Sequence, residues 1–124
     1  MSKVMILDVP VDKLDMQKAT EIVKGYLQSD KPHLIVTPNA EIIMRAQQDR
    51  ELLEIIQNAS LVTGDGAGVV WASKIFKDPL PERITGIDLM FKILEIAQEQ
   101  GYKVFLLGAA PSIAEKAAER LLNI

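Results

Sequence analysis

Short apolar runs rich in β-branched residues alternate along this chain with longer segments of helical periodicity. We predict three principal strands, at residues 34–36, 60–63 and 103–107, and a further strand at residues 4–9. Each principal strand is followed by turn residues and then by a helix, which is typical of domains whose strands run parallel. The sequence therefore predicts a Rossmann-like, layered α/β domain with a largely parallel sheet flanked by helices.

Polar residues that can cap helices precede several of the helical segments. Asn39 is expected to cap one helix, and Asp49 a second helix shortly after it. Asp88 is expected to cap a later helix. Ser112 and Glu115 form a capping-box pattern at the start of the last helix. These caps predict where each helix begins relative to the turn before it.

Other conspicuous residues are assigned to structure rather than to chemistry. Trp71 and the apolar stripe at residues 90–94 are expected in the core. His33 is the only histidine and directly precedes a predicted strand, so we expect a strand-edge position rather than a base or a metal ligand. Two prolines within residues 78–81 exclude regular helix, so a loop is expected there.

Composition narrows the class of protein. The chain has 124 residues, 48% of them hydrophobic and 25% charged, which is the balance of a folded globular domain. Its formal net charge of −3 comes from interspersed acids and bases, so nucleic acid is not an expected partner. The chain has no cysteine, and therefore neither a disulfide nor a thiolate metal site is expected.

The two ends of the chain carry further expectations. The N-terminal residues lack the apolar core of a secretion signal, and no apolar run is long enough to cross a bilayer, so a cytoplasmic location is expected. The last predicted helix runs to residue 124, whereas an α/β sheet normally continues with another strand. We therefore expect residues 1–124 to be a single α/β domain that is the N-terminal part of a longer protein.

Three turns follow the carboxyl ends of the predicted strands, where ligands bind in open α/β sheets. They comprise residues 37–39, 64–68 and 108–112. The second is rich in glycine, and backbone N–H groups of Gly64 and Gly66 are expected to approach an anionic group. The turn lacks the glycine spacing of a dinucleotide site and the Gly-Lys-Ser/Thr end of a phosphate loop, so neither of those ligand modes is expected.

Four side chains near these turns are candidates for chemistry. Asp65 lies between two glycines, where a carboxylate can act as a general base or can simply stabilise a turn. Thr37 and Asn39 can hydrogen-bond a polar ligand, although Asn39 can equally be engaged in capping its helix. Arg83 can bind a diphosphate in a bidentate manner, or can form a surface ion pair with Glu82 or Asp88.

Three ordered motifs, at residues 37–42, 64–72 and 81–89, resemble those of the WecG/TagA/CpsF glycosyltransferase family. The likeness continues through residues 104–108 and the closing helix, and so covers nearly the whole chain. The resemblance implies an inverting transfer of N-acetylmannosamine from its UDP donor to undecaprenyl-diphosphate-linked N-acetylglucosamine, in the synthesis of wall teichoic acid.

The resemblance also implies roles for individual residues and for the partners. Asp65 matches the proposed base, and Thr37, Asn39 and Arg83 match other pocket positions. A short Asp-x-Asp motif is missing, so no metal and no other cofactor is expected. Family members continue for about a further domain's worth of chain. Peripheral contact with the inner face of the cell membrane is expected through segments that this chain does not contain.

Three alternatives stay open on the sequence. The first is a non-catalytic module that binds a nucleotide sugar with the same turns. The second is a family relative that uses a different UDP-sugar donor, and the third is a structural α/β fragment whose turns are only turns. A homo-oligomer is also compatible with the sequence.

Overall fold

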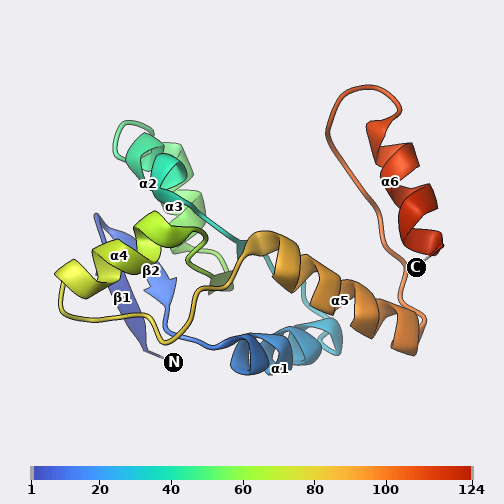
Figure 1. Ribbon diagram of the computed structural model, residues 1–124, viewed down its shortest axis with the longest axis horizontal. Helices are drawn as coiled ribbons and strands as arrows, with labels where there is room; N and C mark the ends of the chain where they lie inside the picture. Colours follow the sequence, from blue (N-terminus) through green and yellow to red (C-terminus); the bar gives the residue numbers. More distant parts are fainter. Residues whose placement is uncertain (1, 124) are drawn as a thin grey trace. The chain divides into compact units, whose positions relative to one another are not determined.

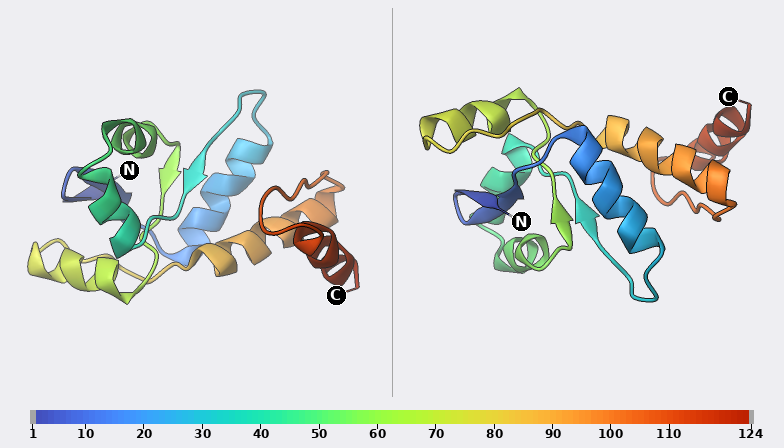
Figure 2. Two further views of the ribbon diagram at one scale, coloured as in Figure 1. Left: turned by 90° about the horizontal axis from the view of Figure 1, so that it is seen from above. Right: turned by 90° about the horizontal axis from the view of Figure 1, so that it is seen from below.

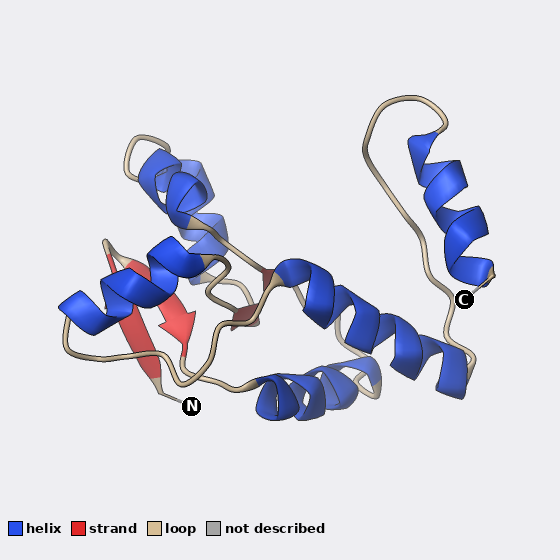
Figure 3. Ribbon diagram, viewed as in Figure 1, coloured by secondary structure: helices blue, strands red, loops and turns tan. Residues whose placement is uncertain are grey.

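The computed structural model describes residues 2–123 as a mixture of helices and short strands in two compact units, Met1–Ile93 and Leu94–Ile124 (Figures 1 and 3). The elements in chain order are β1 (Lys3–Ile6), β2 (Val9–Asp12), α1 (Met16–Leu27), β3 (Ile35–Val36), α2 (Ala40–Ala46), α3 (Arg50–Gln57), β4 (Leu61–Val62), α4 (Ala67–Ile75), α5 (Gly86–Gln100) and α6 (Ile113–Leu122). The mixed α/β class is thereby confirmed.

Strands β3 and β4 form the parallel sheet of the first unit (Figure 2). Ile35 pairs with Leu61 and Val36 with Val62, which confirms two of the predicted strands. Backbone bonding continues past the strand ends, because the N–H of Asp65 donates to the carbonyl of Pro38 at 3.1 Å. The turns that follow the two strands are therefore held side by side.

The N-terminal segment is a hairpin, so the prediction of a single strand at residues 4–9 is wrong. Strands β1 and β2 pair in antiparallel fashion, and the chain reverses at Leu7 and Asp8, which have φ angles of 48° and 68°. Aspartate is common in such a turn, whereas leucine is not. The side-chain amides of Gln47 and Gln57 donate to the Leu7 and Asp8 carbonyls at 2.8 and 3.0 Å, which stabilises the reversal.

Two apolar clusters form the core of the first unit. One joins the hairpin to α2, α3 and α4, and the other joins α1 to β4 and to the start of α5. Asp12 lies between these elements, 3% exposed, and its Oδ2 accepts from the N–H of Val62 at 2.8 Å. Lys3 Nζ lies 3.6 Å from Asp12 Oδ1. The buried carboxylate therefore ties the hairpin to the parallel sheet.

His33 occupies a structural position beside β3. Its ring stacks on that of Tyr26, with 4.0 Å between the centroids, and its Nδ1 lies 3.2 Å from Ser60 Oγ. The hydroxyl of Tyr26 donates to the Ser60 carbonyl at 2.8 Å. Burial, and secondarily the charge of Asp12, raise the pKa of Tyr26 above its usual value, so this phenol stays protonated at neutral pH.

The helix caps agree only in part with the sequence patterns. Asn39 and Asp49 cap α2 and α3 as predicted, accepting from N–H groups three residues ahead at 2.9 and 3.1 Å. The prediction for Asp88 is wrong, because α5 begins at Gly86 and the Thr85 hydroxyl accepts from the Asp88 N–H at 3.1 Å.

The prediction that Trp71 lies in the core is also wrong, because this residue is 66% exposed.

The second unit contains the end of α5, a loop and α6. The predicted strand at residues 103–107 is not formed, and Phe105 and Leu107 are 86% and 90% exposed. Within this unit no other strand is present in the described residues, so the segment has no ladder partner. The predicted capping box is also wrong, because Ser112 has a left-handed φ of 69° and its side chain makes no cap bond.

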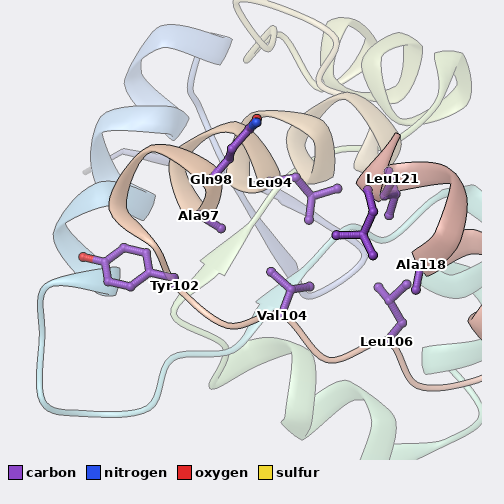
Figure 4. A pocket seen from close by; sticks show the side chains of 9 residues that line it. Leu94, Ala97, Gln98, Tyr102, Val104, Leu106, Ala118 and Leu121 are labelled. Carbon is purple, nitrogen blue, oxygen red and sulfur yellow. The ribbon is translucent and has the colours of Figure 1, made fainter. Parts of the chain in front are cut away.

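An apolar cavity of about 410 Å³ lies within this second unit (Figure 4). It is lined by Leu94, Ala97, Gln98, Tyr102, Val104, Leu106, Ala118, Leu121 and Leu122. None of these residues is a predicted site residue. Its lining comes from the second unit alone.

Candidate functional site

The structure brings together three backbone segments that are far apart in the sequence. Thr37 follows β3, Asp65 follows β4, and Gly86 is the first residue of α5. The N–H of Gly86 donates to Asp65 Oδ2 at 3.3 Å. A Cβ placed on Gly86 would lie 2.9 Å from Thr37 Oγ1 and 3.4 Å from Asp65 Oδ2. The hydroxyl and the carboxylate therefore both face the bare Cα of Gly86.

Asp65 is held by its backbone while its side chain is only partly covered. Its N–H bond to Pro38 fixes the turn, and the residue is half-buried. One carboxylate oxygen accepts from Gly86. A carboxylate that is oriented by the backbone and still reached by solvent can accept a proton from a bound hydroxyl. Its placement beside Thr37 is compatible with the role of general base.

The glycine-rich turn is shaped by close packing and by one left-handed residue. A Cβ on Gly64 would lie 2.9 Å from Leu80 Cδ1 and from Val69 Cγ1, so the backbone is packed tightly there. Gly66 has a φ of 91°, which a glycine adopts without strain. Helix α4 starts directly afterwards, and no side chain caps it. Its first-turn N–H groups can therefore bind an anionic group.

Asn39 has a structural role at the start of α2. Its Oδ1 accepts from the N–H of Ile42 and so caps α2. A Cβ on Gly68 would lie 3.3 Å from the Cβ of Ala40, which places the start of α4 against the start of α2. Two helix N-termini thus lie side by side at this edge of the sheet. Both direct positive ends of helix dipoles toward the region where the Asp65 turn lies.

Arg83 is exposed and is not brought into direct contact with Thr37 or Asp65. The predicted surface ion pairs are not formed either, because Arg83 has no salt bridge among residues 2–123. Glu82 instead accepts from the backbone N–H of Met16 at 2.7 Å. Ile84 is 3% exposed and anchors the segment in the second apolar cluster. The guanidinium therefore extends from an anchored segment near the start of α5.

Sequence reasoning assigned no role to Gly86, although it lies within one of the quoted motifs. Its contribution is the space that lets the Thr37 hydroxyl and the Asp65 carboxylate both approach its Cα, and the absence of a side chain gives no chemical signal in the sequence. The Thr85-Gly86 pair before an apolar stripe was the available signal, because threonine caps helices.

Among residues 2–123 no cluster of three His, Asp or Glu side chains is placed to hold a metal ion.

Comparison with known proteins places these observations in a family. The model of the WecG/TagA/CpsF glycosyltransferase family matches residues 4–123, so the chain belongs to this family. Two similar proteins come from Staphylococcus aureus strains NCTC 8325 / PS 47 and COL. Both are N-acetylglucosaminyldiphosphoundecaprenol N-acetyl-β-D-mannosaminyltransferases, 43% identical to this chain over 118 residues.

The match covers 94% of this chain but 46% of each relative. The chain thus spans about half the length of the curated relatives it matches. Within the described residues, no helix is both long enough and apolar enough to cross a bilayer.

Proposed function

We propose that this chain supplies the general base of an inverting glycosyltransferase. The enzyme moves N-acetylmannosamine from UDP-N-acetylmannosamine to undecaprenyl-diphosphate-linked N-acetylglucosamine, in the synthesis of the wall teichoic acid linkage unit. The observation that carries this proposal is the meeting of Thr37, Asp65 and Gly86. Membership of the family and the names of the staphylococcal relatives support the donor and the acceptor.

The reaction follows from the chemistry of the groups at the carboxyl ends of β3 and β4. Asp65 takes the proton from the acceptor sugar hydroxyl while that oxygen forms a bond to the anomeric carbon of the donor. The acceptor oxygen enters on the face opposite the UDP oxygen, so the configuration inverts. The bond from the anomeric carbon to the UDP oxygen breaks, and its electron pair leaves on the diphosphate. Thr37 hydrogen-bonds the sugar beside Asp65. Asn39 contacts the bound substrate in addition to capping α2.

The developing negative charge is stabilised by groups that need no proton transfer. Backbone donors at Gly64, Gly66 and the uncapped start of α4 bind the diphosphate. Arg83 adds a permanent positive charge with a planar pair of donors. No metal and no other cofactor takes part in this scheme.

The same proposal includes the domain organisation of the enzyme and its location in the cell. The parallel pair β3–β4 belongs to a larger, Rossmann-like layered sheet, and residues 1–124 act as the N-terminal domain of a longer transferase. The enzyme works in the cytoplasm, at the inner face of the cell membrane where its lipid-linked acceptor resides, and a homo-oligomer is compatible with this setting.

A transfer assay on the full-length protein tests the proposal. It combines UDP-N-acetylmannosamine with a detergent-solubilised, polyprenyl-diphosphate-linked N-acetylglucosamine. We expect UDP release that requires the acceptor, and slower release with UDP-N-acetylglucosamine or UDP-glucose. Donor binding without any transfer would instead identify a nucleotide-sugar binding module. Faster transfer from another UDP-sugar would assign a different donor.

Replacement of Arg83 tests the proposed handling of the diphosphate. We expect Arg83→Ala to lower kcat/KM for the donor about tenfold or more, because a charged hydrogen bond contributes roughly 1.5–3 kcal/mol. Stability should not change, since the side chain is exposed and unpaired among the described residues. Arg50→Ala, an exposed arginine of α3, is the matched control. Donor kinetics equal to those of the parent protein would remove Arg83 from the mechanism.

A further inference from the structure

The segment between α4 and α5 carries Arg83 and passes beside the start of α1 (Figure 1). Alternate residues of this segment are anchored to the first unit by burial or by a polar contact, namely Asp78, Leu80, Glu82 and Ile84. The residues between them are exposed, namely Pro79, Pro81 and Arg83. The backbone on both sides of Arg83 is therefore held in place, while the Arg83 side chain is exposed to solvent.

The anchor at Glu82 is a hydrogen bond to the first residue of α1. Glu82 Oε2 accepts from the N–H of Met16 at 2.7 Å, across 66 residues of sequence. The first turn of α1 contains no acid of its own, and Asp15 caps a different N–H, that of Lys18. Unsatisfied N–H groups and the helix dipole stabilise a carboxylate at a helix N-terminus. Glu82 therefore supplies the acid that the first turn of α1 lacks.

This contact also determines the surroundings of the Arg83 guanidinium. Glu82 and Arg83 are neighbours in the sequence, and opposite charges at such short range attract each other. Arg83 nevertheless forms no salt bridge among residues 2–123, while Glu82 is engaged by Met16. A guanidinium without a carboxylate partner keeps all of its N–H donors for an anionic ligand.

We propose that Glu82 is a positioning residue for Arg83. Its bond to α1 fixes the segment that carries Arg83, and the same bond keeps the carboxylate from pairing with the guanidinium. The unpaired guanidinium then binds the diphosphate of the donor, so this inference rests on the proposed function. Glu82 acts through Arg83 and makes no contact with the substrate.

Two conservative replacements of Glu82 separate its reach from its charge. Glu82→Gln keeps an acceptor oxygen at the same reach, so it should still bind the Met16 N–H and leave donor kcat/KM at the parent value. Glu82→Asp keeps the charge but is one methylene shorter, so its carboxylate loses Met16 and becomes free to pair with Arg83. In the full-length protein it should lower kcat/KM for UDP-N-acetylmannosamine about two- to fivefold, the effect of an exposed ion pair that competes for the guanidinium. Hydrogen exchange at the Met16 amide should become faster in Glu82→Asp and not in Glu82→Gln.

The same replacements in an Arg83→Ala background show whether the effect passes through the guanidinium. Glu82→Asp should cause no further loss of donor kcat/KM in that background, a non-additive result. A loss of equal size there would overturn the inference, as would parental kinetics of Glu82→Asp beside an impaired Arg83→Ala, and both results would leave the proposed function intact. Parental kinetics of Arg83→Ala would instead remove the diphosphate role of Arg83 and this inference with it.

Asp15→Ala is the matched control for the stability of α1. It removes a hydrogen bond from the same helix start, where Asp15 accepts from the Lys18 N–H at 2.8 Å, and leaves the sequence around Arg83 unchanged. Its thermal midpoint should fall while its donor kinetics stay at the parent value. Donor kcat/KM that falls in proportion to the thermal midpoint in Asp15→Ala and Glu82→Asp alike would show that Glu82 is only structural, and would overturn the inference.

Discussion

Asp65→Asn is expected to lower the rate of transfer by about 10²–10⁴-fold in the full-length protein, the range over which a positioned general base contributes. Asparagine has the same shape and can still accept the hydrogen bond that Gly86 donates at 3.3 Å. It cannot take up the proton of the acceptor hydroxyl. The loss should therefore appear in kcat measured with saturating donor and acceptor.

Two measurements separate lost chemistry from lost structure. The thermal midpoint and the donor affinity of Asp65→Asn should stay close to those of the parent protein. Asp15→Asn is the matched control, because Asp15 caps α1 through the Lys18 N–H and asparagine caps equally well. A folded Asp65→Asn enzyme with parental turnover would exclude this residue as the base.

Gly86→Ala is expected to lower transfer about hundredfold without changing any group that takes part in the chemistry. The added methyl would lie 2.9 Å from Thr37 Oγ1, closer than such contacts allow, so Thr37 or the start of α5 must move. Displacement of a catalytic arrangement by about 1 Å commonly has an effect of this size. Turnover in the transfer assay and the thermal midpoint are the two quantities to compare.

Two variants identify the cause of the Gly86 effect. Thr37→Ala removes the nearest atom, Oγ1 at 2.9 Å, and leaves the Thr37 Cβ at 3.3 Å. Combining it with Gly86→Ala should therefore recover most of the lost thermal midpoint but not the activity, a non-additive result. Gly25→Ala is the matched glycine control in α1, where an added methyl meets nothing within 4 Å. It should leave transfer unchanged and stabilise the protein slightly. Parental activity of Gly86→Ala would show that the space at Gly86 is not required.

Local sequence signals predicted the parts of the fold that depend on neighbouring residues. Strands β3 and β4 follow from short β-branched runs, and the caps at Asn39 and Asp49 from side chains that bond three residues ahead. The hairpin was missed because its reversal depends on Gln47 and Gln57, which come from distant helices. Such bonds between remote segments leave no trace in local periodicity.

Periodicity alone also gave wrong predictions where the structure of an apolar segment depends on the element that packs or pairs with it. The segment 103–107 has a strand-like composition, yet a strand requires a neighbour to complete its ladder. Trp71 was assigned to the core because it is large and apolar, whereas the buried face of α4 is set by Val69 and Ser73. The turns of the candidate site were located from the sequence, but the role of Gly86 required the positions of Thr37 and Asp65.

The packing around the two glycines links the candidate site to both halves of the core. A Cβ on Gly64 would reach Val11 and Leu80, which belong to the cluster around the hairpin, whereas Gly86 precedes Leu89 of the cluster around α1. The bond between Asp65 and Gly86 therefore joins segments that pack in different clusters. Local opening requires less free energy than global unfolding, so we expect the segments of this site to separate before the whole unit unfolds. Partial opening of either cluster separates the carboxylate from the backbone that orients it, so catalytic competence would fade on warming before the helices melt.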